Sequence, residues 1–306
     1  MAKIEFFMIP LKRSYPVLIF LVVFLSHSFF SVAQTPTQEL DSVNKKKLNR
    51  LVIASSVGYT ASMVVLSKAW YSEFDRQPFS FFDDSKEWFQ VDKIGHFYSA
   101  FHLSNMSANA LIHTGLSKRK SQKIGALSSF LMVSSIEIFD GYSAGYGASA
   151  SDLVANAVGS SVFLGQQLLW NETRIYPKFS FHTTHLANQR PTILGSNFSE
   201  KVLKDYNGQT YWMSIDVDRF TRFPKWLNLA IGYGAHDFIF ASKEANISNG
   251  YSPYRQYYLS IDFDLTSVKT NSKPLKALLY LANMIKLPSP TLEFTRHGVK
   301  SYAFYF

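Results

Sequence analysis

The hydrophobic pattern of this chain changes its period after Trp170. Before that residue, long segments place apolar side chains three or four residues apart, and after it apolar and polar residues alternate. The first spacing is typical of helices with one buried face, and the second is typical of strands. The sequence therefore predicts an α+β fold, in which an N-terminal bundle of about four helices precedes an antiparallel β-sheet region with one amphipathic helix.

The expected helices are separated by short turns, and they cover about residues 48–70, 91–113, 122–139 and 148–170. The last of them carries Ser151, Ala155 and Gly159 at four-residue spacing, which would let a neighbouring helix approach closely. The turn before it, residues 141–145, matches the nucleophile-elbow pattern of hydrolases. Because that elbow must follow a strand and this segment follows an expected helix, we interpret the match as fortuitous.

The C-terminal half contains two nearly identical octets, 211–218 and 257–264, in which polar and apolar residues alternate. Further strands are expected at about 178–186, 226–235, 292–297 and 300–306. The aspartates of the octets are compatible with either a calcium site or a solvated strand face; they are Asp216, Asp218, Asp262 and Asp264. We interpret the basic amphipathic helix expected at 272–286 as a cover for the sheet, with binding to an anionic membrane surface as the alternative.

The N-terminus has the layout of a secretory signal peptide. Lys3, Lys12 and Arg13 precede a short apolar run at 17–25, and small residues precede an expected cleavage after Ala33. The apolar run is shorter than the ~20 residues that a membrane-spanning helix needs, which disfavours an uncleaved anchor. We therefore expect a signal peptide at 1–33, a polar tail at 34–47, a helical domain at 48–175 and a strand-rich region at 176–306.

Two features of the composition limit the classes of function that the chain can have. The sequence contains no cysteine, which excludes disulfides, thiolate metal sites, cysteine nucleophiles and a lipid-bearing N-terminal cysteine. The formal net charge is +9, but no recognition helix, stacking motif or dense basic arm accompanies it, so nucleic acid is not an expected partner. We expect a membrane or lipid surface as the partner instead.

Three of the expected helices carry polar residues inside otherwise apolar segments, where a buried polar group is costly unless it meets a partner, a metal or a ligand. These residues are Asp92, His96 and Ser99 on the second helix, Glu137 and Asp140 at the end of the third, and Asp152 and Asn156 on the fourth. Short connections favour antiparallel packing of neighbouring helices, so we expect these side chains to converge.

Three interpretations of this polar centre stay open. The first is a divalent metal site, with Asp92, His96 and Glu137 as candidate ligands. The second is a metal-free acid–base site in which one carboxylate orients His96 and another is held protonated. For these, the candidate catalytic residues are Asp92, His96, Glu137 and Asp152, and the candidate ligand-binding residues are Ser99, Asp140 and Asn156. The third is a buried network that fixes the register of the helices without chemistry.

Taken together, three motifs resemble those of the YfiM-like family, which are bacterial envelope proteins of unknown function. The motifs are Asp92-Lys93-x-x-His96, Glu137-x-x-Asp140-Gly141 and Ser151-Asp152-x-x-Ala155-Asn156-x-x-Gly159. The first and third are also similar to motifs of VanZ-like membrane proteins. The resemblance covers about residues 48–175, and the longer form with a strand-rich second half resembles the version found in Bacteroidetes-type bacteria.

The resemblance implies an exported protein of the outer membrane or the periplasm-facing envelope of a Gram-negative bacterium, and it implies no particular reaction. We therefore expect a membrane-associated envelope protein whose Asp/His/Glu centre binds or modifies a small envelope ligand, such as a lipid or a glycan. The alternative is a non-enzymatic structural or assembly factor of the outer membrane, in which the polar centre is purely architectural.

Overall fold

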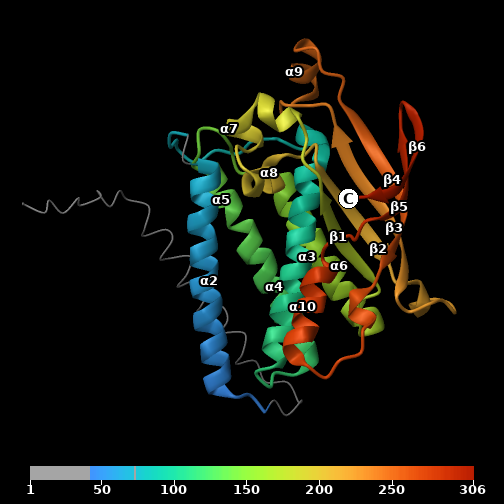
Figure 1. Cartoon of the computed structure of the whole chain (residues 1–306). Helices are drawn as coiled ribbons and strands as arrows, with labels where there is room; N and C mark the ends of the chain where they lie inside the picture. The colour runs from blue at the N-terminus through green and yellow to red at the C-terminus, as the bar shows by residue number, and fades with distance from the viewer. Residues whose placement is uncertain (1–41, 72–73) are drawn as a thin grey trace, which may run out of the picture.

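The computed structural model describes residues 42–71 and 74–306, and within them the long helices lie on one side of a single antiparallel sheet (Figure 1). The predicted α+β fold, with the bundle first and the strands last, is therefore confirmed. The signal peptide expected at 1–33 lies outside the described residues, as do residues 34–41 of the expected polar tail.

The bundle is formed by helices whose boundaries follow the apolar periodicity closely. They are α2 (Lys45–Tyr71), α3 (Val91–Ile112), α4 (Lys118–Ser134), α5 (Ile136–Gly141) and α6 (Ala150–Trp170), with the 3₁₀ turn η1 (Glu87–Gln90) before α3. The third expected helix starts earlier than predicted and is divided into α4 and α5 at Ser135. There Ile138 N donates to Ser135 O, the three-residue spacing of a 3₁₀ turn.

Small residues bring the bundle helices close together, as their spacing predicts. A side chain at Gly159 of α6 would place its Cβ 2.3 Å from the Phe97 carbonyl oxygen of α3. Gly125 of α4 approaches Ala108 of α3 in the same way, with 2.6 Å from such a Cβ to the Ala108 nitrogen. This close approach holds α4 and α6 against α3 and so fixes where their polar residues meet.

The second half forms a six-stranded meander in the order β1-β2-β3-β4-β5-β6, in which every neighbouring pair is antiparallel. The strands are β1 (Ile175–Phe181), β2 (Gln209–Ile215), β3 (Leu227–His236), β4 (Tyr254–Phe263), β5 (Ser289–Thr295) and β6 (Gly298–Tyr305). Each expected strand overlaps one of these, and the expected amphipathic helix is α10 (Lys273–Asn283). The sequence did not predict the short helices α7 (Pro191–Leu194), α8 (Phe198–Lys204) and α9 (Lys243–Ser248), nor the 3₁₀ turns η2 (Leu186–Gln189), η3 (Val217–Arg219) and η4 (Leu265–Ser267).

The sheet curls so that one of its faces is enclosed. The outer edge of β1 bonds to the segment before β5, because Phe179 N donates to Met284 O and Lys286 N donates to Phe179 O. Across the enclosed face, Thr210 Oγ1 of β2 lies 3.1 Å from Tyr305 Oη of β6.

The enclosed face combines a buried aromatic cluster around Trp212 with many buried polar and charged groups. Asp216, Asp262 and Asp264 are 2%, 0% and 6% exposed, so of the two alternatives for the aspartates the solvated strand face is wrong for these three residues. Lys178, also fully buried, places Nζ 2.6 Å from Asp262 Oδ2. A buried charge is stable only when it is paired, and this pair explains why both side chains point inward.

The opposite face of β3, β4 and β5 is apolar and exposed. Paired residues on this face are Leu229, Ile231, Tyr257, Leu259, Leu292 and Phe294, each at least 40% exposed. The described residues therefore leave this apolar face of the sheet uncovered.

Candidate functional site

The polar centre lies where the start of α3, the helix α5 and the start of α6 meet (Figure 1). The chain enters α3 through three consecutive residues with positive φ: Trp88 at 46°, Phe89 at 54° and Gln90 at 62°. Side chains of this size rarely adopt that conformation, and it persists only where neighbouring structure holds it. Here Trp88 N donates to Ala241 O and Tyr233 Oη donates to Phe89 O, so the sheet region fixes the first turn of α3.

Lys93 is the electrostatic hub of the centre. Its Nζ atom lies 2.5 Å from Asp84 Oδ2, 2.8 Å from Asp92 Oδ2 and 3.0 Å from Asp152 Oδ1. Although burial opposes it, the nearby carboxylates raise the pKa of Lys93 above its ordinary value, so the lysine stays charged. One cation therefore joins the loop before α3, α3 itself and α6.

Asp84 anchors this network to the start of α6. Its Oδ1 atom accepts hydrogen bonds from Ser149 Oγ at 2.5 Å and from Ser151 Oγ at 2.8 Å. Burial acts to raise the pKa of Asp84, but the hydrogen bonds from Lys93 and Ser149 hold that pKa below its usual range. Ser149 is also the N-cap of α6, since its Oγ accepts from Asp152 N at 3.0 Å.

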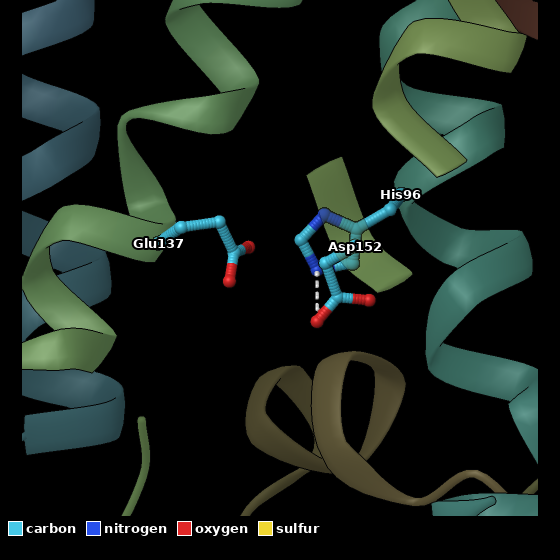
Figure 2. A group of neighbouring side chains, drawn as sticks. All are labelled: His96, Glu137 and Asp152. Carbon is cyan, nitrogen blue, oxygen red and sulfur yellow. Dashed lines mark ion pairs between the residues drawn. The ribbon is translucent and has the colours of Figure 1, made fainter. Parts of the chain in front are cut away.

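His96 is held in one orientation by Asn156. Its Nδ1 atom lies 3.1 Å from Asn156 Oδ1, an amide oxygen that can only accept, so Nδ1 carries the proton and donates. Nε2 is directed toward Asp152, whose Oδ2 lies 3.9 Å away (Figure 2). This separation is too long for a hydrogen bond.

Glu137 points toward His96 and Asp152 from α5, on the other side of the gap (Figure 2). The side chain is 3% exposed; its Oε2 accepts from Ser149 N at 2.9 Å, and its Oε1 has no hydrogen-bond partner among the described residues. Burial raises the pKa of Glu137 to about 9, with a smaller contribution from the neighbouring Asp152. In the metal-free protein Glu137 is therefore protonated at neutral pH.

Two further carboxyls adjoin the centre. Burial raises the pKa of Asp92 to about 6, and the nearby charge of Lys93 limits that rise. Burial likewise raises the pKa of Asp140 to about 6, and Asp140 Oδ1 accepts from Tyr71 Oη at 2.5 Å. Asp140 is thereby tied to the end of α2.

A cavity of about 670 Å³ lies beside the centre, between α2, α3, α8 and the first two strands. Most of its wall is apolar, including Leu51, Met63, Leu66, Leu103, Met132, Ile136, Phe179, Val202 and Leu203. Asp92, His96 and Ser99 also line it. The cavity therefore meets the polar centre at the first two turns of α3.

The structure brings together six of the seven candidate residues: Asp92, His96, Glu137, Asp140, Asp152 and Asn156. The seventh, Ser99, lies on the cavity wall. Potential metal-ligand atoms of His96, Glu137 and Asp152 lie close together, and those of Asp84, Asp92 and Asp152 form a second group. The structure therefore places Asp152, and not Asp92, with His96 and Glu137. The catalytic, ligand-binding and metal roles of these residues stay predictions.

Sequence reasoning did not identify Asp84 or Ser149 as part of the site. Asp84 lies in an irregular loop, where no periodicity indicates the direction of a side chain. Ser149 had a usable signal, because a serine three residues before an acid at the start of a helix is an N-cap pattern.

Comparison with known proteins bears on the region that holds this site. Residues 80–165 match the family model described as "Predicted periplasmic lipoprotein (DUF2279)". Searches of curated proteins and of solved structures give no match. The matched region is less than a third of the chain, and it includes all seven candidate residues. The YfiM-like assignment is not confirmed; the match supports an exported, periplasm-facing protein of the bacterial envelope.

Proposed function

We propose that this chain is a membrane-associated protein of the outer envelope whose Asp/His/Glu centre binds or modifies a small amphiphilic ligand. The observation that carries the proposal is the cavity of about 670 Å³, which is apolar along most of its wall and polar where it meets Asp92 and His96. Its size falls within the ~300–1,000 Å³ of small-molecule sites. Of the two ligand classes expected, lipid and glycan, the apolar wall favours a lipid.

The polar centre has the groups that acid–base chemistry needs. His96 directs Nε2, which can accept a proton when the ring is neutral, into the centre, and Glu137 carries a proton at neutral pH because burial raises its pKa to about 9. A base and an acid held a few ångströms apart can accept and donate protons at the polar group of a bound ligand. The reaction itself is left open by this proposal.

Filling the cavity is expected to abolish ligand binding. Leu103→Trp replaces a leucine in the cavity wall with the larger indole side chain. It should weaken binding of a fluorescent fatty acid by at least about tenfold, because the acyl chain loses its space. Met106→Trp is the matched control, since Met106 is 43% exposed on the same helix and does not line the cavity. Equal binding by both variants would contradict the proposal, and lipid extraction followed by mass spectrometry would identify any ligand that copurifies.

Association with a lipid surface is supported by one strongly basic end of the molecule. Three contacts place its parts side by side: Asn44 N donates to Thr114 O, Lys118 Nζ to Asn171 O, and Asp264 N to Trp226 O. We define the basic end as the exposed cations of this region: Lys45, Lys46, Lys47, Lys118, Arg119, Arg222, Lys225, Lys269, Lys273 and Lys276. In Figure 1 this is the end with the starts of α2 and α10, opposite α9.

Apolar side chains border the basic end. On α10 they are Leu275, Leu278 and Leu281, which are 40–62% exposed, and on α2 they are Ile53 and Val57, which are 65% and 64% exposed. Val64 and Val65 continue the exposed apolar face farther along α2. Among the described helices, the segments Lys45–Lys68 and Lys118–Gly141 are long and apolar enough to cross a membrane, and 11% and 50% of an 18-residue apolar window in each are buried. Basic residues beside exposed apolar ones are typical of proteins that bind anionic lipid surfaces.

Reversing charge at the basic end is expected to reduce vesicle binding. The variant with Lys269, Lys273 and Lys276 changed to Glu should bind vesicles containing phosphatidylglycerol about a hundredfold more weakly, since each lysine contributes about 1 kcal/mol at an anionic surface. The control changes three exposed lysines elsewhere, Lys86, Lys243 and Lys300, to Glu. Equal loss of vesicle binding in both variants would argue against binding through the basic end. Complete release of the protein from vesicles by high salt alone would argue against embedded apolar side chains.

The alternative function, a structural or assembly factor, is favoured by one observation. Lys93 joins three carboxylates on separate segments, an arrangement that can fix helix positions without chemistry. Failure of the wild-type protein to bind or retain any amphiphile would favour this alternative.

A further inference from the structure

We infer that His96, Glu137 and Asp152 form a binding site for one divalent transition-metal ion, of which Zn²⁺ and Mn²⁺ are the best fit. The metal site itself is inferred from geometry alone. Only a role for the ion in chemistry on a bound ligand rests on the proposed function. The potential ligand atoms of the three side chains all lie within 4.8 Å of one another (Figure 2).

Each of the three side chains has one polar atom held by the protein and another directed into the shared gap. His96 Nδ1 is held by Asn156, Asp152 Oδ1 lies 3.0 Å from Lys93 Nζ, and Glu137 Oε2 accepts from Ser149 N. The atoms left to face the gap are His96 Nε2, Asp152 Oδ2 and Glu137 Oε1. Partners that orient ligands in this way are a regular feature of metal sites.

The unsatisfied oxygen of Glu137 is independent evidence for a missing partner. Glu137 is only 3% exposed, and its Oε1 atom has no hydrogen-bond partner among the described residues. Buried polar atoms are almost always satisfied, and each exception in a folded protein calls for an explanation such as an ion. Figure 2 shows this carboxylate directed at the other two ligands.

The distances require only a small adjustment. Zinc is usually tetrahedral and lies ~2.0–2.2 Å from nitrogen and oxygen ligands, so two ligands of one ion are about 3.4 Å apart. His96 Nε2 and Asp152 Oδ2 are 3.9 Å apart, which is close to this separation. The whole set, within 4.8 Å, would reach it after rotation of the side chains.

The charge of the centre also favours a cation. Among the described residues, Lys93 is ion-paired with three carboxylates, those of Asp84, Asp92 and Asp152, so negative charge exceeds positive charge there. Clustered negative charges in a buried site are costly, and a bound divalent cation offsets two of them.

The ligand set indicates the class of metal and leaves room for chemistry. One imidazole and two carboxylates suit zinc or manganese, whereas calcium and magnesium prefer sets made of oxygen only. Three protein ligands leave at least one coordination position for water or substrate, as in catalytic sites. His96 lines the cavity, so a ligand in the cavity could reach that position.

The test is isothermal titration of the EDTA-treated full chain with ZnCl₂ and with MnCl₂. We expect one ion per chain, and Glu137→Gln and His96→Gln should each weaken binding at least tenfold. The matched control is Glu293→Gln, because Glu293 is 2% exposed and both its oxygens already accept hydrogen bonds, from Gln256 and Tyr302. Circular dichroism checks that each variant is folded. Because the Glu137 and His96 variants change different ligands, either one can test the site if the other fails to fold.

Wild-type protein that binds neither ion, or folded Glu137→Gln and His96→Gln variants that bind as tightly as wild type, would overturn the inference. The same EDTA-treated protein is assayed with the fluorescent fatty acid, which separates the two proposals. Binding of the fatty acid without either metal would leave the proposed function intact and refute only the metal site. Binding of metal without the fatty acid would refute only the proposed ligand.

Discussion

Lys93→Met is expected to lower the free energy of unfolding by about 3–5 kcal/mol, the usual effect of removing one partner from a buried ion pair. Lys93 Nζ lies within 3.0 Å of carboxylate oxygens of Asp84, Asp92 and Asp152, and its side chain is only 10% exposed. Methionine keeps much of the length of the side chain and removes the charge, so three carboxylates lose their counter-ion. Urea denaturation followed by circular dichroism measures the change.

The control for this variant is Lys86→Met, a few residues earlier and just before η1. Lys86 is exposed, so its replacement should change stability by no more than about 0.5 kcal/mol. The loss caused by Lys93→Met should also shrink at acidic pH, because protonated carboxyls no longer repel one another. A loss below about 1 kcal/mol at pH 7 would show that Lys93 does not hold the centre together.

The meeting of the polar residues could be predicted because it depends on helix geometry. Asp92 and His96, like Asp152 and Asn156, are four residues apart, so each pair must share one face of its helix. The atom-to-atom arrangement could not be predicted, because it depends on tertiary contacts. The bond from His96 Nδ1 to Asn156, for example, requires the exact approach of α3 to α6 at Gly159.

The positions of the strands could be predicted, but not which face would be enclosed. Alternation assigns residues to two faces, and the usual expectation is that the apolar face is buried. Here Lys178, Asp262 and Lys286 come from three distant segments and meet inside the curled sheet, with Lys286 Nζ 4.0 Å from Asp262 Oδ1. No local pattern predicts such a meeting, because each residue taken alone resembles a solvated side chain.

Glu137→Gln is expected to stabilise the metal-free protein at neutral and alkaline pH. Burial raises the pKa of Glu137 from 4.5 to about 9, so between these pH values the unfolded chain has lost a proton that the folded chain keeps. The unfolded state then binds fewer protons, and stability falls as pH rises through this window. At 1.36 kcal/mol per pH unit, the cost at pH 7 is about 3 kcal/mol. Glutamine resembles the protonated acid and avoids this cost.

The measurement is urea denaturation of both proteins in EDTA from pH 4.5 to pH 9. The curves should nearly coincide at the acid end and separate steadily as pH rises, with the variant more stable. Saturating zinc should reduce or reverse this order, because an ion at one hundred times its Kd stabilises the wild type by about 2.7 kcal/mol and the variant by much less. Parallel curves in EDTA would show that Glu137 ionises in the folded protein. A constant difference with and without zinc would instead show that the carboxylate holds a proton and no metal.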